Sequence, residues 1–381
     1  MTQSPSFPVD AQPDICASAP AYVRAIAPYL PGKPITEVAR ELGLDPARIV
    51  KLASNENPMG MSPGARAAIT EALAGASRYP DGFEAVQAIA RTVGVAPEHV
   101  VLGNGSNDLL EMVASVFLAP GRASVFSQHA FAVYPLATQA RGARAIVVPA
   151  RQFGHDLEAM LAAITADTAV VFVANPNNPT GTRLERTDLV RFLDAVPARV
   201  AVVLDEAYNE YLPPDERAHS VTWLAAHPNL IITRTFSKAY GLAGLRVGYA
   251  LAHPAVAALL NRVRQPFNVN HLALAGAIAA LADTAFVDAS YTLNRAGMAQ
   301  LIEGVTRLGL PFIPSHGNFI CIGIPRTGAD PRAGEVFQAL LRQGVIVRPV
   351  ANYQMPDHLR VTIGLPDENQ RFLDALAQAL R

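Results

Sequence analysis

The sequence contains very little lysine. Of its 31 lysine and arginine residues, three are lysines, namely Lys33, Lys51 and Lys238, which leaves 28 arginines (31 − 3). The net charge is −1 and there is no basic block, so nucleic acid and anionic membranes are not expected partners. The two cysteines, Cys16 and Cys321, are too few for a disulfide framework and have no metal-ligand spacing. We therefore expect no metal site and a reducing, cytoplasmic environment.

The sequence also lacks a hydrophobic run long enough to span a bilayer. Its longest apolar stretch, Leu272 to Leu281, is rich in alanine and predicts a core helix. Residues 1–10 are polar and lack the basic-then-apolar layout of a signal peptide, and residues 1–20 are predicted to be loose. With 381 residues, of which 50% are hydrophobic, the chain is long enough for a large core and two domains.

Seven short, continuously apolar runs alternate with helical segments from residue 100 onward. The runs are residues 100–102, 123–126, 145–148, 169–173, 200–204, 230–233 and 247–251. Strands of this kind, separated by helices, predict a mostly parallel sheet that is covered on both faces. We expect an α/β fold in which a seven-stranded, mostly parallel sheet is sandwiched by helices, together with a smaller α+β domain. The expected parts are an N-terminal arm with part of the small domain (1–61), a large domain (62–283) and a C-terminal small domain (284–381).

Polar clusters follow four of these strands, at the sheet edge where ligands bind in such folds. The clusters are Gly105 with Ser106 and Asn107, an amide-rich turn with Asn178, Asp205 with Tyr208, and Thr235 with Ser237 and Lys238. The first of them begins a helix, and a helix N-terminus attracts phosphate. Taken singly, each cluster also fits an ordinary connector, a helix cap or a glycine-rich turn.

Residues 233–249 contain Lys238, the lysine that is the candidate for binding a cofactor. Lys238 follows a buried strand, where a lysine loses its proton easily and can form a Schiff base with an aldehyde. Thr235, Ser237 and Arg246 can supply donors to a phosphate close by. An aldehyde and a phosphate on one ligand together indicate pyridoxal phosphate (PLP).

These residues lie within motifs that resemble those of the fold-type I PLP-dependent aminotransferases, and within them the histidinol-phosphate aminotransferase family. In the order of the family, and over nearly the whole chain, the motifs are YLPGK, KLASNENPMG, RYPDG, GNGSND, NPNNPTG, DEAY, RTFSKAYGLAGLRVGY and LRVTIG. Eight ordered motifs are far more specific than any one of them. The resemblance implies transamination of L-histidinol phosphate with 2-oxoglutarate, which gives imidazole acetol phosphate and glutamate in histidine biosynthesis.

The resemblance also implies how the cofactor PLP is held. Lys238 would bind its aldehyde and move the proton, and Asp205 would pair with the ring nitrogen and keep it protonated. Tyr208 and Asn178 would donate to the phenolic oxygen. The other implied cofactor-binding residues are Phe131, which stacks on the ring where many relatives have tyrosine, and Gly105, Ser106, Asn107, Thr235, Ser237 and Arg246.

Substrate binding and assembly are implied in the same way. Arg360 would bind a substrate carboxylate, and Arg348, Tyr29 and Asn178 would lie near the substrate. Tyr79 would reach the PLP phosphate of a neighbouring subunit, which implies a homodimer with active sites at the interface. The resemblance further implies a cis peptide bond after Asn178. From the residues alone, Arg348 and Arg360 also fit structural ion pairs, because a guanidinium beside an apolar strand needs an anionic partner.

Three other functions share parts of this pattern. An aminotransferase for aromatic amino acids has the same core, and the sequence QHAFAVY makes phenylalanine or tyrosine plausible donors. A threonine-phosphate decarboxylase would release carbon dioxide without 2-oxoglutarate. A non-catalytic PLP-binding regulator would need an attached DNA-binding module, and no basic or helix-turn-helix segment precedes residue 20.

Overall fold

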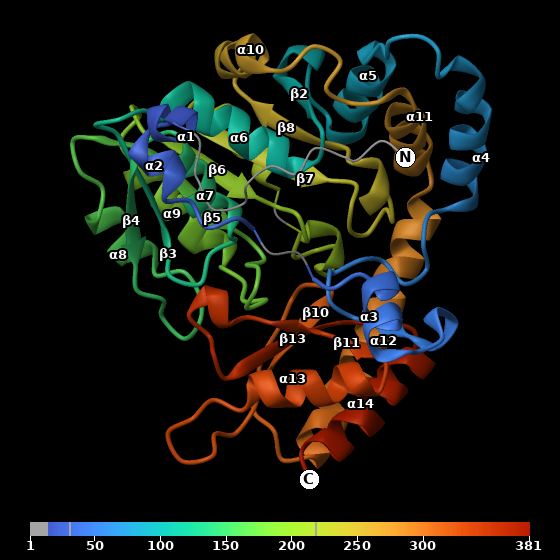
Figure 1. Cartoon of the computed structure of the whole chain (residues 1–381). Helices are drawn as coiled ribbons and strands as arrows, with labels where there is room; N and C mark the ends of the chain where they lie inside the picture. Colours follow the sequence, from blue (N-terminus) through green and yellow to red (C-terminus); the bar gives the residue numbers. More distant parts are fainter. Residues whose placement is uncertain (1–13, 30–31, 218) are drawn as a thin grey trace.

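A computed structural model describes residues 14–29, 32–217 and 219–381 and shows two main sheets (Figure 1). The larger sheet has seven strands in the order β2-β8-β7-β6-β5-β3-β4. The strands are β2 (Val100–Gly103), β3 (Ala123–Ser127), β4 (Arg144–Val148), β5 (Thr168–Ala174), β6 (Ala201–Asp205), β7 (Leu230–Thr235) and β8 (Gly248–Ala252). Neighbouring strands are parallel, except that β8 is antiparallel to both β2 and β7. The predicted seven-stranded, mostly parallel sheet is confirmed.

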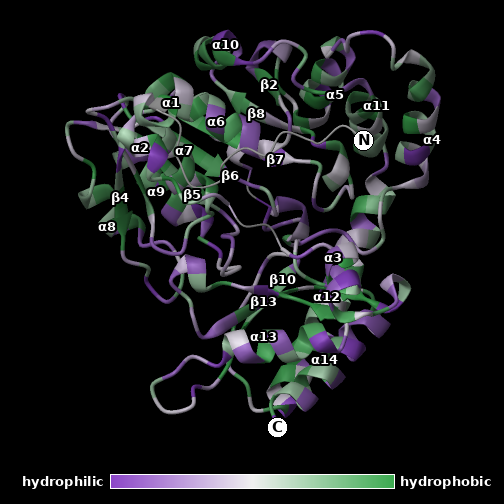
Figure 2. Ribbon diagram, viewed as in Figure 1, coloured by the Kyte–Doolittle hydropathy of each residue, from purple (hydrophilic) through white to green (hydrophobic). Residues whose placement is uncertain are grey.

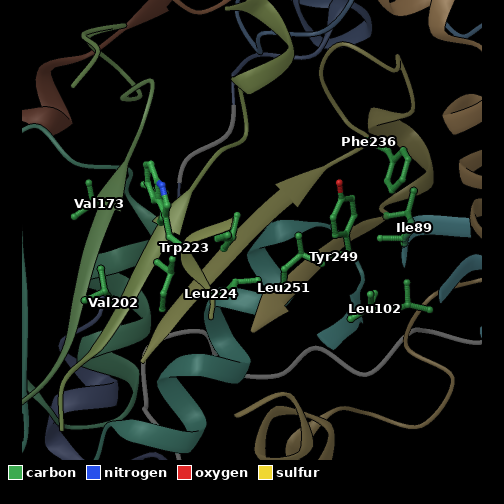
Figure 3. Packing of buried hydrophobic residues seen from close by; sticks show 14 of the residues in the cluster. Ile89, Leu102, Val173, Val202, Trp223, Leu224, Phe236, Tyr249 and Leu251 are labelled. Atoms are coloured by element: carbon green, nitrogen blue, oxygen red, sulfur yellow. The ribbon is translucent and has the colours of Figure 1, made fainter. Parts of the chain in front are cut away.

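Both faces of this sheet are buried except along the edge strand β4, most of whose residues are exposed. Successive side chains of a strand point to opposite sides, so each buried strand contributes to two hydrophobic clusters. In β5, Val171 and Val173 pack in one hydrophobic cluster, whereas Val170 and Phe172 pack in another. Figure 3 shows part of the first cluster, in which Trp223 and Leu224 pack beside the strands. The helices that contribute to the first cluster cover one face of the sheet and include α4 (Pro63–Ala72), α5 (Phe83–Val93), α8 (Leu157–Ala162), α9 (Arg186–Ala195) and α11 (His271–Ala282). Those that contribute to the second cluster cover the other face and include α6 (Ser106–Phe117), α7 (Val133–Ala140) and α10 (Pro254–Val263).

The second sheet is antiparallel and has the order β12-β13-β10-β9. Its strands are β9 (Phe312–Ile313), β10 (Phe319–Gly323), β12 (Arg348–Pro349) and β13 (His358–Thr362), and a separate parallel pair is formed by β1 (Val50–Lys51) and β11 (Val345–Ile346). It packs with α12 (Thr284–Arg307), α13 (Ala333–Arg342) and α14 (Pro366–Ala379) in a third hydrophobic cluster. Figure 1 shows this part in orange and red below the larger sheet. The domain limits after residues 61 and 283 remain a prediction.

The N-terminal part of the described chain is more ordered than the sequence predicts. Residues 14–18 form the short helix α1 (Asp14–Ser18), inside the segment predicted to be loose, while that prediction for residues 1–13 lies outside the described chain. Helices α2 (Ala21–Arg24) and α3 (Ile35–Leu42) follow. The 3₁₀ helices are η1 (Pro46–Arg48), η2 (Leu73–Gly75), η3 (Pro97–His99), η4 (Asn209–Tyr211), η5 (Ser220–Trp223), η6 (Ala243–Leu245) and η7 (Ala351–Tyr353).

The hydrophobic residues lie mainly inside this arrangement. Figure 2 shows hydrophobic strands in the larger sheet and hydrophilic residues on outer helices such as α4 and α14. The predicted core helix over Leu272–Leu281 is confirmed as α11. In residues 14–29, 32–217 and 219–381, no single helix is long and apolar enough to cross a membrane. Helices α11 and α12 would pass that test only together, and the chain bends by 80° between them.

Candidate active site

The predicted polar clusters meet at one edge of the larger sheet. The carboxyl ends of β2, β3, β5, β6 and β7 lie there, because these strands run in the same direction. Strand β8 is antiparallel, so residues 236–247 turn back at this edge instead of crossing the sheet. A pocket at this edge is lined by Ser106, Asn107, Phe131, Asn178, Asp205, Tyr208, Thr235, Ser237, Lys238 and Arg246, and across from them by Tyr29, Arg348 and Arg360.

Asp205 ends β6 in a buried position and is 5% exposed. The Tyr134 hydroxyl donates to its Oδ2 at 2.9 Å, and the Thr233 hydroxyl donates to its Oδ1 at 3.2 Å. Burial disfavours the charged carboxylate and raises the pKa of Asp205 to about 6, while the hydrogen bonds from Tyr134 and Thr233 act in the opposite direction. Asp205 is therefore mostly ionised at neutral pH and can pair with a protonated ring nitrogen.

Lys238 lies in the loop after β7, and its side chain is half-buried. Its Nζ donates to the backbone oxygen of Ser54 at 3.1 Å. The loss of water around the ammonium group, followed by repulsion from Arg360 and Arg246, lowers the pKa of Lys238 to about 7. A lysine with this pKa presents a substantial fraction of neutral amine near pH 7, which is the form that reacts with an aldehyde.

The other two lysines are held in ion pairs away from this pocket. Lys33 pairs with Glu37 and Glu41 at 3.4 and 2.5 Å, and the hydrogen bond that it donates to Glu41 is the main reason that its pKa is raised. The Nζ of Lys51 donates to both carboxylate oxygens of Glu56 at 3.0 Å. Among the lysines, Lys238 alone lines the pocket.

The start of α6 forms one wall of a site for an anion. The first N–H groups of a helix have no partner within it and attract phosphate. Gly105 precedes Ser106 with a φ of 82°, a conformation that favours glycine, and a β-carbon at position 105 would overlap the Arg246 guanidinium. Arg246 Nη1 donates to the Ser237 hydroxyl at 3.2 Å, and the Thr235 hydroxyl accepts from the backbone N–H of Ser237 at 3.1 Å. These donors are suited to a phosphate.

The second sheet supplies two arginines to the same pocket. Arg348 and Arg360 are paired directly between β12 and β13, so their side chains start on one face. Arg360 Nη1 donates to Asn178 Oδ1 at 2.5 Å, and Nη2 donates to the backbone oxygen of Ala53 at 2.9 Å. Its Nε is buried without a hydrogen-bond partner in the described part of the chain, which leaves it for an anionic ligand. The Arg348 guanidinium lies 5.7 Å from the centre of the Tyr29 ring.

Tyr208 is a neutral hydrogen-bond donor in this site. It is 3% exposed, and burial raises the pKa of its hydroxyl to about 12. The Asn55 amide Nδ2 donates to its Oη at 2.9 Å. Because Asn178 Oδ1 accepts from Arg360, the amide nitrogen of Asn178 is likewise left to donate elsewhere. Two neutral donors therefore accompany Lys238 and Asp205.

The pocket is lined by every predicted site residue except Gly105 and Tyr79. Gly105 lies directly behind it, against Arg246. Tyr79 is 80% exposed and stacks on Phe267, with the ring centres 4.3 Å apart, outside this chain's own pocket. The cis peptide bond after Asn178 is present, and a second one follows Asn175. An amine, a buried carboxylate, neutral donors and an anion site form the donor set that PLP requires.

The sequence did not single out several polar side chains of this site. Ser54, Asn55 and Tyr353 line the pocket, and Tyr134 contacts Asp205 from behind it. Ser54 and Asn55 belong to the quoted motif KLASNENPMG, which was the available signal for them. Tyr134 lies three residues after Phe131, but nothing in the sequence indicates that its hydroxyl reaches Asp205. In the described ranges, no group of three or more His, Cys, Asp or Glu side chains could hold a metal.

Comparison with known proteins gives a consistent result. Residues 47–376 match the family model described as aminotransferase class I and II. The chain is 58% identical to histidinol-phosphate aminotransferase 2 of Nitrosospira multiformis over 96% of this chain and 93% of the relative. It is 61% identical to histidinol-phosphate aminotransferase 2 of Pseudomonas aeruginosa over 96% of this chain and 99% of that relative. The crystal structure of histidinol-phosphate aminotransferase from Sinorhizobium meliloti in complex with pyridoxal-5'-phosphate is similar, with a TM-score of 0.87, 28% identity, and coverage of 95% of this chain and 97% of the other.

Proposed function

The chain belongs to the class I and II aminotransferase family, and from this premise we propose that it is a PLP-dependent histidinol-phosphate aminotransferase. It would transfer the amino group of L-histidinol phosphate to 2-oxoglutarate, giving imidazole acetol phosphate and glutamate in histidine biosynthesis. The observation that carries the proposal is the pocket in which Lys238, with its lowered pKa, is enclosed together with Asp205 and the two arginines of the second sheet. We expect the reaction to take place in the cytoplasm.

PLP, when bound, supplies an electron-accepting ring attached to the substrate nitrogen. Asp205 would hold a proton on the ring nitrogen, and Tyr208 and Asn178 would donate to the phenolic oxygen. Lys238 would hold the aldehyde until the substrate amine displaces it. Its freed amine would then take the proton from the α-carbon of the substrate and deliver it to the former aldehyde carbon of the cofactor, a task that suits an amine with a pKa of about 7. Phe131 would cover the ring, and the residues that would hold the phosphate are Gly105, Ser106, Asn107, Thr235, Ser237 and Arg246.

The substrate side of the pocket must accept two kinds of anion. Histidinol phosphate has a phosphate and no carboxylate, whereas glutamate has two carboxylates. Guanidinium groups bind both kinds of anion, and Arg360 has a buried Nε without a partner in the described ranges. We propose that Arg360 binds the glutamate carboxylate beside Asn178, and that Arg348 and Tyr29 bind the distal anion of either substrate.

We further propose that the enzyme is a homodimer in which Tyr79 of each subunit reaches the PLP phosphate of the other. The support is the exposure of Tyr79 and of the Phe267 ring on which it stacks, which are 80% and 54% exposed. Phe83 and Leu73, close to Tyr79 in the sequence, are 60% and 56% exposed, and exposed large hydrophobic side chains in contact are typical of an interaction surface.

Complementation tests this shared site. A dimer of one Lys238→Ala subunit and one Tyr79→Ala subunit contains one site with both residues intact, so refolding the two inactive variants together is expected to restore activity. A mixture that stays as inactive as its components would contradict the shared site, while gel filtration would still report the dimer itself.

A half-reaction screen tests the transamination. The PLP-loaded enzyme is mixed with L-histidinol phosphate, L-phenylalanine or O-phosphothreonine, and the visible absorbance of the bound cofactor is followed in each. We expect histidinol phosphate to discharge the absorbance fastest and to yield imidazole acetol phosphate, and Lys238→Ala to abolish turnover. Faster discharge by phenylalanine would favour the aromatic aminotransferase, and carbon dioxide release from phosphothreonine would favour the decarboxylase.

A further inference from the structure

Asn55 connects the two sheets at the pocket. It lies in the segment between β1 and α4, is 1% exposed and has a φ of 54°. This left-handed conformation is one that asparagine adopts more readily than most residues. On one side the Asn55 backbone N–H donates to the Thr362 hydroxyl of β13 at 2.9 Å, and on the other its Nδ2 donates to Tyr208 Oη at 2.9 Å.

The hydrogen bonds around Asn55 have a defined direction. The Thr362 hydroxyl accepts from the Asn55 backbone and donates its own hydrogen to Asn55 Oδ1 at 3.2 Å. Once Oδ1 faces Thr362, the amide nitrogen faces Tyr208, and an amide nitrogen can donate but cannot accept. The hydrogen of the Tyr208 hydroxyl therefore points away from Asn55.

The remaining direction leads into the pocket. Asn55 is the hydrogen-bond partner of Tyr208 Oη within the described ranges, and Tyr208 lines the pocket. A donor whose direction is set before the ligand arrives needs no reorganisation during the reaction, and such preorganised donors contribute strongly to catalysis. Thr362 also lies two residues after Arg360 on the same strand, so both side chains start on one face of β13.

Building on the proposed function, we propose that Asn55 is a positioning residue that makes Tyr208 donate its hydrogen to the phenolic oxygen of PLP. The relay runs from the Thr362 hydroxyl through the Asn55 amide to the Tyr208 hydroxyl. Through it, the second sheet, which carries Arg360 for the substrate, also sets the donor on the cofactor. Asn55 itself acts through Tyr208 and contributes no atom to the reaction.

Substitution at position 55 can reverse or remove this relay without a new backbone conformation. In Asn55→Asp an acceptor replaces the amide nitrogen, so the Tyr208 hydroxyl turns its hydrogen toward position 55; aspartate also tolerates the left-handed conformation. Asn55→Gly keeps that conformation and removes the side chain, which leaves the Tyr208 hydroxyl free to rotate. Thr362→Val leaves residue 55 unchanged but removes the first donor of the relay together with the acceptor of the Asn55 backbone N–H.

The readout is the pH midpoint of the change in visible absorbance of the bound cofactor, measured on the holoenzyme. Loss of a hydrogen bond to the ionised phenolic oxygen disfavours its deprotonated form, so Tyr208→Phe is expected to raise the midpoint by about one to two pH units. Asn55→Asp is expected to raise it by a similar amount. Asn55→Gly and Thr362→Val are expected to raise it by less.

A double-mutant cycle separates the relay from the added charge of aspartate. In the Tyr208→Phe background, Asn55→Asp and Thr362→Val are expected to cause little further shift, because the group on which they act is gone. Two results would overturn the relay. In the first, Asn55→Asp shifts the midpoint equally in the wild-type and Tyr208→Phe backgrounds. In the second, Tyr208→Phe shifts the midpoint but Asn55→Asp does not. An unshifted midpoint in Tyr208→Phe would overturn it as well.

These outcomes are distinct from failure of the proposed function. A wild-type chain that develops no visible absorbance with PLP would overturn the proposed function and the relay together. Normal absorbance that is insensitive to position 55 would overturn the relay alone. If Asn55→Asp failed to fold, as judged by its thermal unfolding, Asn55→Gly and Thr362→Val would decide the question through the same cycle.

Discussion

The hydrogen bond from Tyr134 to Asp205 gives the sharpest prediction. Tyr134→Phe removes the hydroxyl that lies 2.9 Å from Asp205 Oδ2 and keeps the ring, which stacks on Phe172 with the ring centres 4.7 Å apart. A hydrogen bond to a charged group contributes about 1.5–3 kcal/mol, and each pKa unit corresponds to about 1.4 kcal/mol. We therefore expect the pKa of Asp205 to rise by about one to two units from its value of about 6 in the unloaded chain.

The consequence for the cofactor follows from that shift. With a pKa of about 7 to 8, much of Asp205 would be protonated at pH 7 before PLP binds, and that proton would oppose the pairing with a protonated ring nitrogen. At pH 7 the removal of that proton weakens PLP binding by about twofold to tenfold, because the affinity falls by the factor 1 + 10^(pKa − pH). Equilibrium titration of the apoenzyme with PLP, followed by visible absorbance, measures this change.

Two further variants make the test specific. Thr233→Val removes the longer bond to Asp205, at 3.2 Å, and is expected to weaken PLP binding less than Tyr134→Phe does. Tyr249→Phe changes a buried tyrosine of β8 that does not line the pocket, and is expected to leave PLP affinity unchanged. Unchanged affinity in Tyr134→Phe, or a larger loss in Thr233→Val, would refute the reasoning.

Three other predictions concern the phosphate site, the lysine and the substrate arginine. Gly105→Ala is expected to weaken PLP binding, because the added β-carbon would overlap Arg246. The control is Gly121→Ala, at a similar φ of 85° with open space around it, which should lower stability without changing PLP affinity. Equal PLP affinities of these two variants would contradict this prediction. The rate at which PLP associates with the unloaded chain should rise roughly tenfold from pH 6 to pH 8 and then level off, because Lys238, with a pKa of about 7, loses its proton over this range and becomes reactive. An association rate, measured by stopped-flow mixing, that keeps rising beyond pH 9 would contradict this prediction. Arg360→Ala should raise the KM for glutamate by roughly tenfold to hundredfold and affect histidinol phosphate less, and equal losses in steady-state kinetics would contradict that role.

The sequence predicted the larger sheet well because its strands, apart from the edge strand β4, are buried on both faces. Runs such as Ala169–Val173 are apolar at every position, since alternate residues enter different hydrophobic clusters on the two sides of the sheet. Because parallel strands end at the same edge of the sheet, the polar residues that follow such runs, including Asp205 and Lys238, were predicted to lie together there. The direction of β8 could not be read from its composition, because a buried strand looks the same in either orientation.

What the sequence did not reveal depends on contacts between distant residues. Tyr134 and Asp205 are 71 residues apart, and Asn55 and Tyr208 are 153 residues apart. Neither pair has a spacing that a local pattern could indicate. The alternating pattern predicted a helix between β3 and β4 but not the bounds of α7, whose first turn contains Pro135, a residue that usually signals a break unless it stands at a helix start.

The scarcity of lysine has a chemical consequence for labelling. Reagents that acylate amines react with the unprotonated form, and near pH 7 about half of Lys238 is unprotonated, whereas the raised pKa of Lys33 keeps it charged. Lys51, the third lysine, is engaged by both carboxylate oxygens of Glu56. A small amine-acylating reagent would therefore label Lys238 in preference to the other two lysines, and saturation with PLP would protect Lys238 from labelling.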